Sequence, residues 1–252
     1  MSKGIKYTGM EENMDKKIIV MGASSGIGRE VARLFLQRGF YVGLAARRSE
    51  PLKKLKKAFP DQAEILQIDV TREDAPALLR ELIRQLGGMD VYFHAAGVGD
   101  HNETLMPDIE MKTVDTNAVG FTRMVGEAYR YFAEKGEGHV ACITSIAGTK
   151  GLGPAPSYSA TKAFQNVYLQ ALEQEAHTRH LAIRFTDIRP GFVDTPLLSK
   201  PYPMLMKPER VAKAIVRAIL HRRHVLVIDW RWRILTALWQ RMPRFLWRRI
   251  KI

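Results

Sequence analysis

The chain has 252 residues, of which 46% are hydrophobic, enough for one large α/β domain with its own core. A single cysteine, Cys142, excludes an internal disulfide and indicates a reducing compartment such as the cytoplasm. The net charge of +13 suggests nucleic acid or membrane, but +7 of it lies in residues 230–252, where there is no acid. The rest of the chain carries only +6, so we expect no nucleic-acid partner.

Three segments differ in composition. Residues 1–15 are polar and mixed in charge, so we expect a flexible leader and no signal peptide. Residues 16–229 have the pattern of one folded domain, and residues 230–252 form a basic amphipathic extension. No run of 18 apolar residues occurs, so no membrane-spanning helix is expected.

The first element of the domain is a short buried strand, 18–21, followed by a glycine-rich turn and a helix over 27–38. The turn contains Gly22, Gly26 and Gly28. Glycines let the backbone approach a pyrophosphate, and the N-terminus of the helix favours its negative charge. The sequence therefore predicts a dinucleotide site here, the alternative being a plain glycine-rich turn.

The second strand, 40–46, ends in Arg47 and Arg48. An acidic residue at this point would bind the ribose 2′-hydroxyl of NAD, whereas arginine suits the 2′-phosphate of NADP. The first acid is Glu50, so the pattern favours NADP over NAD. The alternative is two solvated arginines after a strand.

Strands and helices continue to alternate along the chain. Further strands are expected at 65–68, 91–96, 140–144, 181–188 and 224–229, and helices at 49–59, 71–86, 105–135, 158–180 and 208–221. This alternation predicts an α/β fold, a doubly wound parallel sheet with helices on both faces, that is, a Rossmann fold.

Three polar residues stand out near the middle of the chain. Tyr158 and Lys162 are four apart, so a helix places both on one face. We expect the lysine ammonium to lower the tyrosine pKa and make it a usable general base. Ser145 follows a buried strand and could bind the same substrate oxygen. Taken alone, Tyr-x-x-x-Lys is more often a solvated helix face.

Together these motifs resemble the short-chain dehydrogenase/reductase family. Gly22-x-x-x-Gly26-Ile27-Gly28 is similar to its cofactor turn, and Asp69-Val70 to its adenine-contacting pair. Its catalytic tetrad matches Asn117, Ser145, Tyr158 and Lys162, and its nicotinamide-contacting stretch matches Pro190-Gly191 and Thr195. The resemblance covers about residues 16–229, with the motifs in the family's order.

The resemblance implies an NADP(H)-dependent oxidoreductase that transfers hydride between the nicotinamide and a carbonyl or secondary alcohol. Tyr158 would be the acid/base, Ser145 would orient the substrate, Lys162 would hold the nicotinamide ribose, and Asn117 would anchor a water that relays protons to Lys162. The implied cofactor-binding residues are Gly22, Ser24, Ser25, Gly26, Ile27, Gly28, Arg47, Arg48, Asp69, Val70, Ala96, Gly97, Asn117, Tyr158, Lys162, Pro190, Gly191, Val193 and Thr195.

Three other functions stay open: an NAD-linked alcohol dehydrogenase, a dinucleotide-binding regulator or scaffold without turnover, and a peripheral membrane protein whose enzyme domain is incidental. The intact tetrad argues against the scaffold, because a sensor needs only the cofactor half of the site. The resemblance also implies a homotetramer or homodimer, with the helices of Asn117 and Tyr158 at an interface. No metal is expected.

Two positions depart from the family pattern. Met21 stands where the family has threonine, and His94-Ala95-Ala96-Gly97 where it has Asn-Asn-Ala-Gly. We expect Met21 and Ala95 to replace a polar contact by an apolar one, because an unmatched buried polar group would cost more. His94 is expected to be a satisfied core histidine.

The extension 230–252 and the segment 195–208 carry the remaining predictions. Apolar residues recur at helical spacing in the extension, with arginines between them and Pro243 dividing the helix. It could lie on the inner face of a membrane, or pack on its own domain or another subunit. The segment 195–208 is where the family places its substrate lid, and a lipophilic pocket is expected from Leu197, Leu198, Tyr202, Met204 and Leu205.

Overall fold

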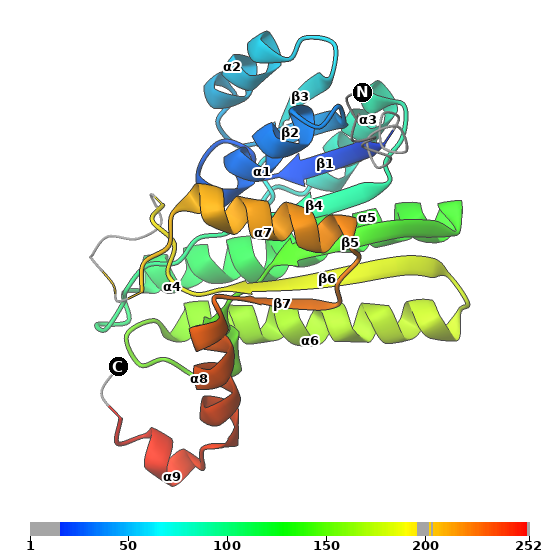
Figure 1. The fold of residues 1–252 in the computed structure, drawn as a ribbon. Coiled ribbons are helices and arrows are strands. Elements are labelled where there is room, and N and C mark those ends of the chain that lie inside the picture. The colour runs from blue at the N-terminus through cyan, green and yellow to red at the C-terminus, as the bar shows by residue number, and fades with distance from the viewer. Residues whose placement is uncertain (1–15, 196–201, 203, 251–252) are drawn as a thin grey trace, which may run out of the picture.

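The computed structural model describes residues 16–195, 202 and 204–250; the predicted leader, Leu197 and Leu198 lie outside these residues. Seven strands form one parallel sheet in the order β3-β2-β1-β4-β5-β6-β7 (Figure 1). The strands are β1 (Lys17–Met21), β2 (Tyr41–Ala46), β3 (Ala63–Gln67), β4 (Val91–His94), β5 (Glu137–Ile143), β6 (Ala182–Pro190) and β7 (Val225–Ile228). The doubly wound parallel sheet predicted from the sequence is confirmed.

Helices cover both faces of this sheet. One hydrophobic core joins it to α1 (Gly26–Leu36), α2 (Glu50–Ala58) and α7 (Pro208–Leu220). A second core joins the opposite face to α3 (Ala75–Leu86), α5 (Phe121–Lys135) and α6 (Pro156–Thr178). In β1, Ile18 and Val20 belong to the first core and Ile19 and Met21 to the second. Such continuous apolar runs are typical of parallel strands buried on both faces.

The segment 105–135 was expected to be helical throughout, and it contains three distinct pieces. Helix α4 (Pro107–Val114) passes into a π-helical turn, η2 (Asp115–Gly120), and then into α5. Gly120 packs tightly here, since a Cβ atom on it would lie 2.8 Å from Cγ2 of Val70. Asn117 lies in this π-helical turn, and such turns are frequent at functional sites.

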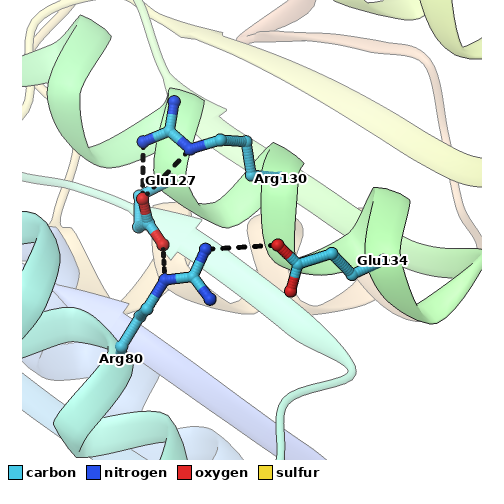
Figure 2. A network of polar contacts seen from close by, with 4 residues as sticks. All are labelled: Arg80, Glu127, Arg130 and Glu134. Atoms are coloured by element: carbon cyan, nitrogen blue, oxygen red, sulfur yellow. Dashed lines mark hydrogen bonds and ion pairs between the residues drawn. The ribbon is translucent and has the colours of Figure 1, made fainter.

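An ion-pair network fastens α3 to α5 on the second face of the sheet. Glu127 is buried and lies between Arg80 of α3 and Arg130 of its own helix (Figure 2). Arg80 also reaches Glu134, with 3.3 Å between its Nη2 and the carboxylate. The buried carboxylate is thus compensated by two guanidinium groups, as a buried charge requires.

The chain ends in α8 (Trp230–Arg241) and α9 (Arg244–Trp247), which meet at Pro243 as predicted. Asp229 caps α8, its Oδ1 accepting a hydrogen bond of 3.0 Å from the backbone N of Arg231. One face of α8 packs on the protein's own domain, where Trp232 and Thr236 are buried. Among the helices of the described residues, none combines the length and the apolar character needed to cross a bilayer.

Candidate active site

The predicted site residues follow the carboxyl ends of the strands β1 to β6 or lie in the π-helical turn η2 and in helix α6. The order of the strands reverses between β1 and β4, because β2 and β3 lie on one side of β1 and the later strands on the other. Parallel sheets bind ligands at such a switch point, where the loops after two neighbouring strands diverge.

Tyr158 lies in the first turn of α6, and its ring packs against the loop that follows β4. A Cβ atom on Gly99 would lie 2.5 Å from the Tyr158 ring, so only glycine allows this contact. The protein packed around the Tyr158 hydroxyl raises its pKa, while a hydrogen bond with the Ser145 side chain acts in the opposite direction. The Ser145 Oγ also accepts a 3.0 Å hydrogen bond from the N of Ala147.

Lys162 is buried one turn after Tyr158 in α6. Its Nζ donates to the carbonyl oxygen of Ile143 at 3.1 Å and to Oε1 of Gln165 at 3.0 Å. Burial lowers the Lys162 pKa to about 8. The Nζ lies 5.7 Å from the centre of the Tyr158 ring.

The predicted effect of Lys162 on the tyrosine is therefore wrong for the site as it stands. Burial raises the Tyr158 pKa, and Lys162 is not among the groups that lower it. The reason is geometric, because the ammonium is turned toward the end of β5 and Gln165. A raised pKa keeps Tyr158 protonated at neutral pH, which suits a proton donor.

Asn117 is held in the π-helical turn by the loop after β4. Its side chain accepts from the N of Val98 at 2.9 Å and donates to the O of Val98 at 2.7 Å. Its main-chain oxygen accepts a 2.7 Å hydrogen bond from Nε2 of Gln165. A side-chain amide thus joins Asn117 to Lys162, at the place where the resemblance implied a water.

Sequence reasoning missed Gln165, which is fully buried. The signal was its position three residues after Lys162, which puts both on one face of α6. Glutamine has one acceptor and two donors on a side chain long enough to reach both neighbours.

The glycine turn has the shape that a pyrophosphate site requires. Gly22 has a φ of +97°, and a Cβ atom on Gly28 would lie 2.3 Å from the carbonyl oxygen of Gly22. Ser25 is the N-cap residue of α1, so the backbone N–H groups at the start of that helix face the turn. Ile27 fixes the helix by packing against the first core. These residues fit a dinucleotide.

The two arginines after β2 differ in their contacts. The Nη2 of Arg48 lies 3.1 Å from Oγ of Ser25 and 3.4 Å from Oγ of Ser24. The backbone O of Arg47 accepts from Nε2 of Gln67, and the Arg47 side chain makes no hydrogen bond or ion pair with the described residues. Arg48 and the two serines therefore form one polar cluster at the rim of the glycine turn.

The remaining predicted cofactor residues lie around this turn. Asp69 accepts two hydrogen bonds from Thr71, at 3.0 and 2.8 Å, and Val70 is buried against Gly120. Ala96 lies close to Gly22, because a Cβ atom on Gly22 would lie 2.7 Å from the backbone N of Ala96. A Cβ on Gly97 would lie 3.3 Å from Oδ1 of Asn117 and 3.7 Å from Nζ of Lys162.

The stretch after β6 closes the site from the other side. Pro190 ends β6, Gly191 donates to the O of Ile228 at 2.8 Å, and Val193 pairs with Met206. A Cβ on Gly26 would lie 3.2 Å from Cγ2 of Thr195, so this stretch reaches the glycine turn.

Trp232 of α8 is a second residue that the sequence did not reveal. A Cβ on Gly191 would lie 2.2 Å from its indole nitrogen, so Trp232 packs directly on the Pro190-Gly191 turn. Phe192 stacks on Tyr202 with 4.2 Å between ring centres and meets Trp232 edge to face. The C-terminal extension thus supports the wall of the site.

His94 is a core residue, as predicted, but only one of its ring nitrogens has a partner in the described part of the chain. Nδ1 lies 2.9 Å from the hydroxyl of Tyr92, and Nε2 has none. Burial lowers the His94 pKa to about 3, and the positive charge of Lys162 acts in the same direction.

This histidine should make the fold sensitive to acid. An unfolded histidine has a pKa near 6.5, so below that pH the unfolded state binds a proton that folded His94 does not. Stability is therefore complete above pH 6.5 and falls as the pH drops toward 3, by about 2 kcal/mol between pH 7 and pH 5. Urea unfolding of His94→Asn should show a smaller difference between these two pH values, whereas His221→Asn, at an exposed site, should match the wild type. An unchanged difference in His94→Asn would contradict this assignment.

Comparisons with known proteins show the family to which the chain belongs. The family model for short chain dehydrogenase matches residues 16–204. This chain belongs to the short-chain dehydrogenase/reductase family and is an NAD(P)-dependent oxidoreductase of that family. An uncharacterized oxidoreductase of Myxococcus xanthus is 34% identical over 221 residues, which cover 82% of this chain and 87% of that protein.

Other relatives carry more specific names. Glycine betaine reductase ATRR of Emericella nidulans is 33% identical over 231 residues, covering 83% of this chain and 18% of that protein. The structure of serine dehydrogenase from Escherichia coli has a TM-score of 0.74 and 28% identity, covering 84% of this chain and 96% of that one. A closed form of serine dehydrogenase complexed with NADP+ has the same TM-score and 25% identity, covering 84% and 94%.

Proposed function

We propose that this protein is an NADP(H)-dependent carbonyl reductase, which in the reverse direction oxidises a secondary alcohol. The observation that carries the proposal is half-buried Tyr158, which lies beside Ser145 and 5.7 Å from the Nζ of buried Lys162 at the carboxyl edge of the sheet. Each of these groups has a role in moving one proton to or from a substrate oxygen.

The chemistry of the chain's own residues follows from their positions. Tyr158 donates its proton to the substrate oxygen, and the Ser145 hydroxyl donates a second hydrogen bond to the same atom. Lys162, whose Nζ lies 5.7 Å from the centre of the Tyr158 ring, would hold the nicotinamide ribose, and Gln165 holds the lysine in position. The nicotinamide, when bound, supplies the hydride that the reduction consumes. The residues that would hold it are Gly97, Asn117, Lys162, Gly191 and Thr195.

The preference for NADP is supported by the Arg48 cluster. A guanidinium that already lies within reach of two serine hydroxyls matches the geometry of a 2′-phosphate. The end of β2 carries no carboxylate that would repel the 2′-phosphate. Serine dehydrogenase, which is similar in structure, has been solved in complex with NADP+.

A lipophilic substrate is supported by the aromatic wall next to Gly191. Phe192 and Tyr202 stack on each other there, and Trp232 lies behind them. Leu205 adds an exposed apolar side chain to the same segment. A hydrophobic ketone or its alcohol is the substrate class that such a lining favours.

A homodimer or homotetramer is supported by the outer face of α6. Phe164 and Val167 are exposed on this helix, with 41% and 65% of their surface accessible. Apolar side chains exposed side by side on one helix are typical of a protein interface. We propose that α5 and α6 pack against their counterparts in another subunit.

Titration with NADPH and NADH, followed by nucleotide fluorescence, tests the cofactor half of the proposal. Arg48→Ala should weaken NADPH binding about ten- to a hundredfold and leave NADH binding unchanged, because only NADPH carries the 2′-phosphate. Arg47→Ala is the matched control and should have a smaller effect, and the double variant shows whether the two arginines act together.

Three outcomes would change the proposal. Equal affinity for both nucleotides would favour the NAD-linked alcohol dehydrogenase. Tight binding with no turnover of any ketone or alcohol would favour a dinucleotide-binding regulator. Binding of neither nucleotide would overturn the enzyme assignment.

A further inference from the structure

Helix α8 is apolar on two opposite sides. Trp232 and Thr236 face the protein and are buried. Trp230, Ile234 and Leu238, at intervals of four residues, lie on the other side of the helix, where 65%, 54% and 61% of their surface is exposed. Packing on the domain therefore uses only one of the two apolar sides.

Helix α9 also exposes apolar side chains. Phe245 and Leu246 are exposed there by 56% and 44%. We call these five side chains, Trp230, Ile234, Leu238, Phe245 and Leu246, the tail surface. So many large apolar side chains on one short segment indicate a binding surface for an apolar partner.

The charge around the tail surface has one sign. After Asp229 the sequence has no acid, and six arginines lie between residues 231 and 249. Arg231 pairs with Asp229, while the other five have no carboxylate partner among the residues that the structure describes. All four tryptophans of the chain are in this segment as well. Arginine and tryptophan beside aliphatic residues are typical of helices that lie in a lipid–water interface.

We propose that α8 and α9 dock the protein on the surface of an anionic lipid bilayer. The apolar residues of the tail surface enter the acyl boundary, and the arginines between them bind lipid phosphates. A second copy of the chain fits less well, because a twofold contact would place arginine-rich segments against each other. Nucleic acid would use the arginines and leave the aliphatic side chains exposed.

Docking through this surface would bring the lipid close to the active site. The tail contacts the loop between Ser145 and Tyr158, where Nε1 of Trp247 donates to the O of Gly151 at 2.8 Å and Nζ of Lys150 donates to the O of Met242 at 2.9 Å. It contacts the nicotinamide turn through Trp232 and Gly191. The walls on both sides of the site are thus attached to the surface that meets the membrane.

Sedimentation of the full-length protein with vesicles tests this proposal. Vesicles of equimolar phosphatidylglycerol and phosphatidylcholine should bind the protein, and vesicles of phosphatidylcholine alone should not. Ile234→Ser with Leu238→Ser should weaken binding about tenfold, because two large aliphatic side chains are lost. Arg241→Glu with Arg244→Glu should weaken it about a hundredfold.

Two variants serve as matched controls. Lys54→Glu with Lys57→Glu makes the same charge change on α2, near the opposite edge of the sheet, and Leu220→Ser with Val225→Ser removes two exposed apolar side chains from α7 and β7. Both should bind vesicles like the wild type. All variants should keep the NADPH affinity of the wild type, which separates a failure of docking from a failure of folding or of the proposed enzyme function.

Several results would overturn the proposal. Absence of vesicle binding by the wild type is one. An equal loss in the α2 variant is another, since it would indicate diffuse attraction by the net charge. If the tail variants instead dissociate an oligomer in analytical ultracentrifugation and leave vesicle binding intact, the tail surface is a subunit interface.

Discussion

Replacing Tyr158 by phenylalanine should lower the turnover number for ketone reduction by about 10²- to 10⁴-fold and leave the Kd for NADPH nearly unchanged. The substitution removes only the hydroxyl, which is the proton donor, and keeps the ring that packs on Gly99. Steady-state kinetics with NADPH and a hydrophobic ketone, together with nucleotide fluorescence, would measure both quantities.

The raised pKa of Tyr158 predicts different pH dependences for reduction and oxidation. Its hydroxyl stays protonated at neutral pH, so reduction needs no prior ionisation, whereas oxidation of the alcohol needs the tyrosinate. We therefore expect the rate of oxidation to increase with pH above neutrality more steeply than the rate of reduction changes.

Tyr168→Phe is the matched control for this substitution. Tyr168 lies on the same helix, half-buried and stacked on Phe164, and its loss should leave turnover unchanged. A Tyr158→Phe enzyme that retained a turnover within about tenfold of the wild type would show that another group donates the proton. The Ser145 hydroxyl would then be the first candidate.

Most of the fold could be predicted because each element depends on residues close together in sequence. The run Ile18 to Met21 is buried on both faces, and its short length and the glycine turn after it indicate a parallel strand. The turn Gly22 to Gly28 has a spacing that only a tight strand–helix connection needs. The parallel pairing of the strands followed from the alternation of strands and helices, whereas their order in the sheet comes from the structure.

What could not be predicted depends on contacts between distant segments. Gln165 bridges Asn117 and Lys162, and only the fold brings the main-chain oxygen of Asn117 within 2.7 Å of it. The direction of the Tyr158 pKa shift was predicted wrongly, because spacing of four residues indicates nearness but not where the ammonium points. The contact between Trp232 and Gly191 joins residues 41 positions apart and has no local signal.

Gln165→Leu should destabilise the fold by about 3 kcal/mol. Leucine is similar in size, but it leaves the O of Asn117 without the Nε2 donor and the Nζ of Lys162 with the Ile143 oxygen as its remaining partner. One of the two lost hydrogen bonds involves a buried ammonium, which is costly to leave under-compensated. Urea unfolding would measure the loss, and Gln170→Leu, at an exposed position of the same helix, should cost little.

The pH dependence of the enzyme distinguishes positioning from stability alone. Burial already lowers the pKa of Lys162 to about 8, and the loss of an acceptor should lower it further. In Gln165→Leu the decline of kcat/KM for ketone reduction at alkaline pH should therefore begin at a lower pH than in the wild type. Gln165→Glu keeps an acceptor and adds a negative charge, so its decline should begin at a higher pH. Opposite shifts in these two variants would show that Gln165 positions Lys162 and keeps it protonated. Equal pH profiles of kcat/KM would show that Gln165 only packs.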